Sequence, residues 1–177
     1  MTNAFKGRDA GKTVTGGLFG TQRLRDFAER SGLVEMRSAS YTHPLAVTAT
    51  LARFHTVNSA IEVDLAGQVN AEFLGSRYVG TVGGQTDYFR AARSSEGGLA
   101  IVALVSATAK GTSRIVPRCG HVTTPSSEVD LIVTEHGIAD LRGIDDAGCV
   151  RAMLAITDAR FAPRLLECAR RALKVPA

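Results

Sequence analysis

Residues 98–107, GLAIVALVSA, form a continuous apolar run that begins at a glycine, and this run most constrains the fold. A run of this length without polar alternation is typical of a β-strand buried on both faces. Residues 129–135, VDLIVTE, form a second such run. Strands of this kind need helices around them, and helical patterns occupy residues 145–156 and 162–173. The sequence therefore predicts an α/β fold with an open, mostly parallel or mixed sheet and flanking helices.

Two shorter patterns predict local elements. In residues 21–32, TQRLRDFAERSG, we expect a helix in which Leu24, Phe27 and Ala28 share one face and Gly32 ends the helix. Residues 58–73, NSAIEVDLAGQVNAEF, place apolar and β-branched residues on both sides of AGQ, which is typical of a hairpin.

Length and composition restrict the function classes. A chain of 177 residues is long enough for one domain with a real core and short for two, so we expect a single domain, 1–177. The net charge of +4 comes from basic residues scattered among acids, which argues against a nucleic-acid partner. No apolar run reaches the roughly 20 residues of a membrane span, so we expect no membrane partner.

The N-terminus and the cysteines indicate a compartment. The first residues lack the apolar segment of a secretory signal. The 3 cysteines are far apart and have no CxxC spacing, which argues against a disulfide framework and a zinc site. We therefore expect a cytoplasmic protein that needs no metal.

Residues 80–92, GTVGGQTDYFRAA, concentrate glycines directly before a predicted helix. Because Gly83 and Gly84 have no Cβ, their backbone N–H groups are unshielded, and with Asp87 as the cap they would lie at the positive end of the helix. Such donors suit an anion or a developing oxyanion. Lys110, in ATAKGTSR, follows the long apolar strand and is expected at its carboxyl end, where open α/β sheets bind ligands. The alternative is that the glycines make a simple turn and Lys110 is solvated.

Several motifs together resemble a known family. In chain order they are NSAIEVDLAGQVNAE, VGGQTDYFRAA, SATAKGTSRIVP, HVTTPSSEVDLIVTEHGIADLRG and ITDARF. The series resembles the C-terminal half of the acetyl-CoA hydrolase/transferase family, which includes 4-hydroxybutyrate and succinyl-CoA:acetate CoA-transferases, from about Thr2 to the C-terminus. The resemblance implies a CoA-transferase (NagB/RpiA-like) half-domain that takes coenzyme A as a substrate, together with an acyl-CoA and a small carboxylate.

The same resemblance implies a ping-pong reaction and assigns residues to it. A glutamate attacks the acyl-CoA, and the enzyme–CoA thioester then passes CoA to an acceptor acid or to water. Gly84 matches the glycine of the oxyanion hole, with Gly83 beside it at the thioester end of CoA. Ile61 and Lys110 match CoA contacts, and Lys110 is expected to meet the charged part.

The family's nucleophilic glutamate has no counterpart here, because its motif precedes the segment at which this sequence starts. Glu62 and Glu135 lie in other motifs of the family. We therefore expect half of an active site, inactive alone, which meets an N-terminal half-domain or forms a homo-oligomer. Two alternatives are a non-catalytic CoA- or nucleotide-binding module and a structural subunit that acts through a partner.

The glycine, TAKG and VTE motifs also depart from the family's usual residues. Tyr88 and Ala91 replace an aromatic residue and a glycine of the family pattern, Val105 and Ala107 a proline and a serine, and His136 a tyrosine. These changes bear on which acyl group is accepted rather than on the fold.

Overall fold

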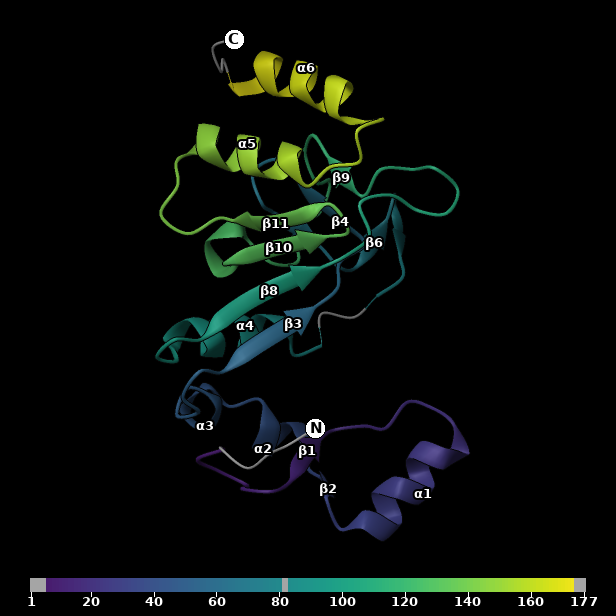
Figure 1. Ribbon diagram of the computed structural model, residues 1–177, viewed down its shortest axis with the longest axis vertical. Helices are drawn as coiled ribbons and strands as arrows, with labels where there is room; N and C mark the ends of the chain where they lie inside the picture. Colours follow the sequence, from purple (N-terminus) through teal and green to yellow (C-terminus); the bar gives the residue numbers. More distant parts are fainter. Residues whose placement is uncertain (1–5, 81–82, 174–177) are drawn as a thin grey trace.

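Two lobes lie one above the other along the long axis of the molecule (Figure 1). The computed structural model describes residues 6–80 and 83–173. We call residues 6–42 the N-terminal lobe and residues 45–173 the main body. The chain passes from one to the other through two short helices, α2 (Ala39–Thr42) and α3 (Leu45–Thr48).

The main body is built on a four-stranded sheet with the order β11-β10-β8-β3. The strands β3 (His55–Asn58), β8 (Leu99–Ala103) and β10 (Leu131–Thr134) are parallel, and β11 (Gly137–Asp140) returns antiparallel to β10. This arrangement confirms the mixed, mostly parallel α/β sheet that the apolar runs predict.

The two faces of β8 are not buried equally. Ala100 and Val102 are fully buried, whereas Leu99, Ile101 and Ala103 are half-buried. The prediction that both faces of this strand are covered is therefore confirmed in part: one face is fully buried, and the other is half-buried.

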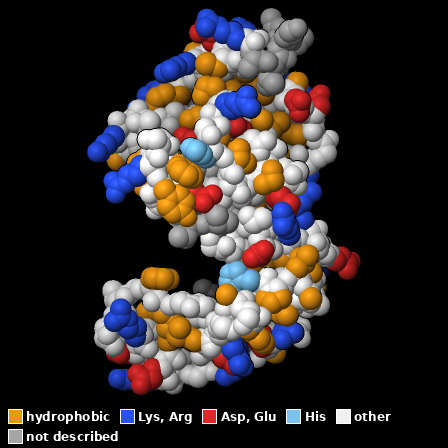
Figure 2. Space-filling model, turned by 180° about the vertical axis from the view of Figure 1, so that it is seen from behind, with side chains coloured by type: hydrophobic (Ala, Val, Ile, Leu, Met, Phe, Trp, Pro, Cys, Tyr) orange, Lys and Arg blue, Asp and Glu red, His pale blue; other side chains and the backbone are white. Residues whose placement is uncertain are grey.

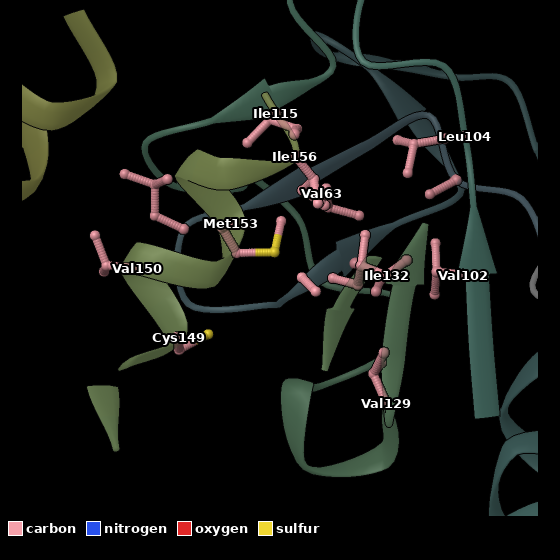
Figure 3. Packing of buried hydrophobic residues seen from close by; sticks show 14 of the residues in the cluster. Val63, Val102, Leu104, Ile115, Val129, Ile132, Cys149, Val150, Met153 and Ile156 are labelled. Atoms are coloured by element: carbon pink, nitrogen blue, oxygen red, sulfur yellow. The ribbon is translucent and has the colours of Figure 1, made fainter. Parts of the chain in front are cut away.

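Three helices flank this sheet. They are α4 (Gln85–Ser94), α5 (Asp146–Ala155) and α6 (Ala162–Leu173). Helix α4 packs against β8 and β3, α5 packs against β11, and α6 lies on α5. From α5, Met153 joins the buried cluster with Val63 and Ile132 (Figure 3), so one core links the helices to both larger sheets.

A second sheet has the order β5-β4-β9. It contains β4 (Glu62–Asp64), β5 (Val69–Asn70) and β9 (Ile115–Val116), and the antiparallel pair β4–β5 confirms the predicted hairpin. The Asp64 carboxylate closes its turn by accepting hydrogen bonds from the N–H groups of Ala66 and Gln68. A smaller hairpin, β6 (Phe73–Leu74) with β7 (Arg77–Tyr78), and the 3-10 helix η1 (Ser126–Glu128) complete the main body.

The N-terminal lobe consists of β1 (Thr13–Thr15), α1 (Gln22–Ser31), β2 (Val34–Met36) and α2. Helix α1 ends at Gly32, which has a left-handed backbone (φ 62°), as the sequence predicts. Its expected apolar face is not buried, however, because Phe27 keeps 51% of its surface exposed and no residue of α1 is buried.

Candidate functional site

The glycine loop leads directly into helix α4. Gly84 is the N-cap residue and Gly83 has a left-handed backbone (φ 54°), whereas Thr81 and Val82 lie outside the described residues. The expectation that Asp87 caps this helix is wrong, since Asp87 lies within its first turn. Gly84 has no side chain with which to cap the helix, and the described residues supply no other cap, so the N–H groups of the first turn lack an intrahelical acceptor.

Gly84 is also crowded by a residue that the sequence reading missed. A Cβ at position 84 would lie 2.3 Å from His43 Nε2 and 2.8 Å from Tyr88 Cε2. The rings of His43 and Tyr88 lie 4.8 Å apart. Glycine is therefore needed at position 84 for packing, independently of any ligand. The contact with His43 could not be predicted from the sequence, because the two residues lie far apart along the chain.

Ile61 lies where the chain enters β4, and its backbone is held on both sides. Its N–H donates to the carbonyl of Asn70 at 2.8 Å, and its carbonyl accepts from Arg114 Nε at 2.8 Å. The same guanidinium also donates to the carbonyl of Ala60. Arg114 thus joins the Ile61 loop to the segment that carries Lys110. Arg114 lies in the motif SATAKGTSRIVP, but the sequence alone did not predict this role.

Lys110 lies at the tip of the loop that leaves the carboxyl end of β8. The loop is closed by hydrogen bonds from Thr108 N–H to the Thr112 carbonyl and from Gly111 N–H to the Thr108 carbonyl. Lys110 is exposed, and within the described residues its ammonium has no hydrogen bond or ion pair. The loop starts after the carboxyl end of β8, and the Lys110 ammonium is exposed at its tip; its expected contact with CoA stays a prediction.

A contact chain connects the glycine loop with the Ile61 loop. Gln85, the first residue of α4, is buried and donates from Nε2 to Thr124 Oγ1 at 3.1 Å. Thr124 in turn forms a β-bridge with Val69 of β5, which pairs with β4 directly after Ile61. The structure thus ties Gly84 and Ile61 to one small sheet, whereas within the described chain no hydrogen bond or ion pair joins Lys110 to either.

Glu135 lies at the carboxyl end of β10, next to the end of β8. Its carboxylate accepts hydrogen bonds from the N–H and the hydroxyl of Ser106, each at 2.8 Å. These two donors hold the pKa of the Glu135 carboxyl below its ordinary range. His136 Nε2 lies 3.7 Å from the same carboxylate. The sequence reading placed Glu135 at a strand end but gave it no function.

The larger cavity reaches the start of α4 through Tyr88, whereas Ile61, Lys110 and Glu135 do not line it. Its volume is about 650 Å³ and it is lined from both lobes, among others by Arg8, Tyr41 and Phe54. Figure 2 shows a deep notch between the lobes. A second cavity of about 320 Å³ is lined by residues that follow Lys110, among them Gly111, Thr112 and Ser113, and by Arg164 of α6.

Two of the three cysteines, Cys119 and Cys149, are buried. All three are free, and burial raises the pKa of the Cys149 thiol to about 11. Across residues 6–80 and 83–173, no three histidine, cysteine or acidic side chains gather as metal ligands. In the same part of the chain, no helix has both the length and the apolar character to cross a bilayer.

The chain was compared with known proteins by sequence and by structure. Residues 20–169 match the family described as the acetyl-CoA hydrolase/transferase C-terminal domain. The 4-hydroxybutyrate coenzyme A transferase of Clostridium kluyveri is 38% identical over 171 residues, which are 94% of this chain and 40% of that protein. The succinyl-CoA:cyclohexane-1-carboxylate CoA transferase of Geobacter metallireducens is 34% identical over 175 residues, covering 97% of this chain and 40% of that protein.

Solved structures agree with the sequence relatives. RipA from Yersinia pestis superposes with a TM-score of 0.90 at 30% identity, over 98% of this chain and 40% of its own. The 4-hydroxybutyrate CoA-transferase of Porphyromonas gingivalis gives a TM-score of 0.81 at 34% identity, over 96% and 40%. The chain thus spans about 40% of the length of these relatives. The resemblance seen in the sequence motifs is confirmed, and the chain belongs to the acetyl-CoA hydrolase/transferase family as its C-terminal domain.

Proposed function

We propose that this chain forms the CoA-binding half of the active site of an acyl-CoA:carboxylate CoA-transferase or acetyl-CoA hydrolase. A glutamate from an N-terminal half attacks the thioester carbonyl of the acyl-CoA, which gives a mixed anhydride and releases the CoA thiolate. The thiolate then attacks the glutamyl carbonyl, so that the acyl group leaves as its carboxylate and CoA is held as a glutamyl thioester. An acceptor carboxylate reverses these two steps and leaves as a new acyl-CoA, whereas water hydrolyses the thioester to glutamate and free CoA. The two relatives named above are CoA transferases, which supports CoA as the substrate of this domain.

The uncapped start of α4 at Gly84 is the observation that carries this proposal. Attack on a thioester places negative charge on the carbonyl oxygen, and fixed N–H donors stabilise that charge best when they need no rearrangement. The first turn of α4 offers such donors at the helix's positive end. Gly83 and Gly84 keep side chains away from them.

Ile61 and Lys110 would bind other parts of CoA. The carbonyl of Ile61 is fixed by Arg114, so this loop is a rigid wall for the pantetheine arm. The Lys110 ammonium, which has no partner within the described residues, is suited to the phosphates of the nucleotide. The cavity beside Lys110 contributes a second cation, Arg164, to the same surface.

The glutamates nearest to these motifs are already engaged, which supports a nucleophile from outside this chain. Glu62 accepts from Asn70 Nδ2, Glu72 accepts from the Thr123 hydroxyl, and Glu135 accepts from Ser106. We therefore expect that the isolated chain neither turns over acetyl-CoA nor forms a glutamyl thioester that borohydride reduces. Turnover well above buffer would contradict this expectation.

Calorimetric titration with CoA and with pantetheine, at two salt concentrations, tests the binding half. Lys110→Ala should weaken CoA binding about two- to fivefold at low salt and less at high salt, and it should leave pantetheine, which lacks the nucleotide phosphates, unchanged. Arg25→Ala removes an exposed cation of α1 and is the matched control. Equal weakening of both ligands by Lys110→Ala, or equal effects of the two variants, would show that Lys110 is an ordinary surface lysine.

A further inference from the structure

The N-terminal lobe contains a β-α-β unit whose sheet has two strands in the described chain. Strands β1 and β2 run parallel, with Thr13 opposite Val34 and Thr15 opposite Met36, and α1 connects them. Parallel strands normally lie in sheets that are covered on both faces. A two-stranded sheet is marginally stable at best. The unit therefore has the form of one part of a larger sheet.

The hydrogen bonds of this pair show how its backbone is oriented. The N–H of Thr13 donates to the carbonyl of Leu33 at 2.7 Å, and the N–H of Arg37 donates to the carbonyl of Thr15 at 3.0 Å. Thr13 and Thr15 thus direct their backbone groups toward β2.

Successive residues of a strand direct their backbone groups to opposite sides. The N–H and carbonyl of Val14 therefore point away from β2, and those of Val34 and Met36 point away from β1. Since the sheet has no third strand in the described chain, both outer edges are open. Open edges of this kind accept a further strand.

Apolar side chains of the same unit are exposed. Phe19 is 96% exposed, Met36 60% and Leu33 48%, and Phe27 of α1 lies exposed as well. In Figure 2 orange side chains are spread over the surface of this lobe. Exposed apolar groups on a unit with open sheet edges indicate a surface that another protein part covers.

We infer that the N-terminal half of the family completes this unit, by adding a strand to an open edge of the β1–β2 sheet and covering its apolar side chains. The matched family is a C-terminal domain, and the larger part of each relative lies outside the match. Because the matched family is a C-terminal domain, that part of each relative precedes the match and joins it on the side of the β1–β2 unit. The structural boundary between the halves then follows β2, near Arg37, although the sequence alone predicted one domain.

This inference rests on the proposed function for the identity of the partner, but it concerns docking and not chemistry. The test compares the isolated chain with a fusion in which the part of the Clostridium kluyveri enzyme that precedes the match is placed before it. Hydrogen exchange is followed at residue resolution. The Val14 amide reports on the β1 edge, and the amides of Val34 and Met36 report on the β2 edge. On at least one of the two edges, exchange should be at least about tenfold slower in the fusion than in the isolated chain. The Val102 amide in the central sheet should not change.

Proline variants of the fusion test the strand addition itself. Val14→Pro and Val34→Pro each remove one outward N–H and leave the bonds between β1 and β2 in place. Protection is read at Met36 for Val34→Pro and, because Val14→Pro removes the reporter amide itself, at the amides of the fused half for Val14→Pro. One of the two variants should abolish the added protection on its edge, whereas Val14→Thr and Val34→Thr, which keep the N–H, should retain it.

Three results would overturn the inference. One is equally fast exchange of these amides in the fusion and in the isolated chain, and another is full protection in both proline variants. The third is protection in the isolated chain that rises with its concentration, because the occupant is then a second copy. A fusion that shows protection but no CoA transfer would contradict the proposed function and leave the docking surface standing.

Discussion

The substitution Gly84→Ala should destabilise the domain, because the added methyl group would collide with His43. The added Cβ would lie 2.3 Å from His43 Nε2 and 2.5 Å from Cδ2, whereas ordinary contacts begin at 3.4 Å. The ring must therefore withdraw by about 1 Å, and overpacking of this kind costs about 1–3 kcal/mol. Backbone strain adds little, since Gly84 has φ −95° and ψ 9°, outside the left-handed region.

The double variant with His43→Ala isolates this contact. His43→Ala alone loses the ring contact with Tyr88, worth about 0.5–1.5 kcal/mol. In the double variant the space left by the imidazole accepts the new methyl group, so the combined loss should fall short of the sum by about 1–2 kcal/mol. For a domain of this size, each kcal/mol corresponds to about 2–4 °C in Tm.

Urea unfolding followed by circular dichroism measures the four corners of this cycle, and CoA titration is run on the same proteins. Gly120→Ala is the control, because a Cβ there meets nothing within 4 Å. If the two substitutions add, the crowding argument is refuted. If stability returns in the double variant while CoA binding stays weak, Gly84 has a second function in exposing its backbone to the ligand.

Two further predictions follow from the same kinds of contact. Gly98→Ala should cost at least about 2 kcal/mol in urea unfolding, because its Cβ would lie 2.1 Å from the Ala92 carbonyl oxygen, which is backbone and cannot turn aside; a loss no larger than that of Gly120→Ala would contradict this. Ser106→Ala should raise the pKa of the Glu135 carboxyl toward its ordinary range in an NMR titration, since one of its donors is removed. Because the folded pKa is lowered, the stabilisation that Ser106→Ala removes should be present above the carboxyl's unfolded pKa and disappear as the pH falls through the folded pKa. Ser127→Ala, at an exposed serine, is the control. The same Glu135 pKa in the unsubstituted chain, in Ser106→Ala and in Ser127→Ala would contradict the claim that Ser106 lowers it.

The sequence predicted the elements whose causes are local. The run at 98–107 has few alternatives to a buried strand, and the hairpin at 58–73 is fixed by Asp64, which closes its own turn. The end of α1 at Gly32 follows from the one residue that enters the left-handed region without cost. The strand, the hairpin turn and the helix end each depend on residues that lie close together along the chain.

The elements of the site that the sequence did not predict depend on distant neighbours. His43 contacts Gly84 and Arg114 holds Ile61, and in both cases the partners lie more than 40 residues apart along the chain. The cap of α4 was misassigned for a related reason, since Asp87 has a favourable residue type but the helix begins earlier, at a glycine. A capping preference of roughly 1 kcal/mol is too small to set a helix start against tertiary contacts.

His43 also connects the N-terminal lobe with the start of α4, where the proposed oxyanion donors lie. It lies between α2 and α3, where the chain leaves the N-terminal lobe, and its ring packs against Gly84 and Tyr88 at the start of α4. The start of α4, which carries the donors of the proposed oxyanion site, therefore packs against the segment through which the chain passes from the lobe to the main body. If the proposed docking of an N-terminal half fixes the lobe, it also restrains His43 and, through the contact of its ring, the start of α4 that carries the proposed oxyanion donors. On that proposal, a carboxylate added to this chain by itself would not be enough to give CoA transfer, because the oxyanion donors would lack the support of a fixed lobe.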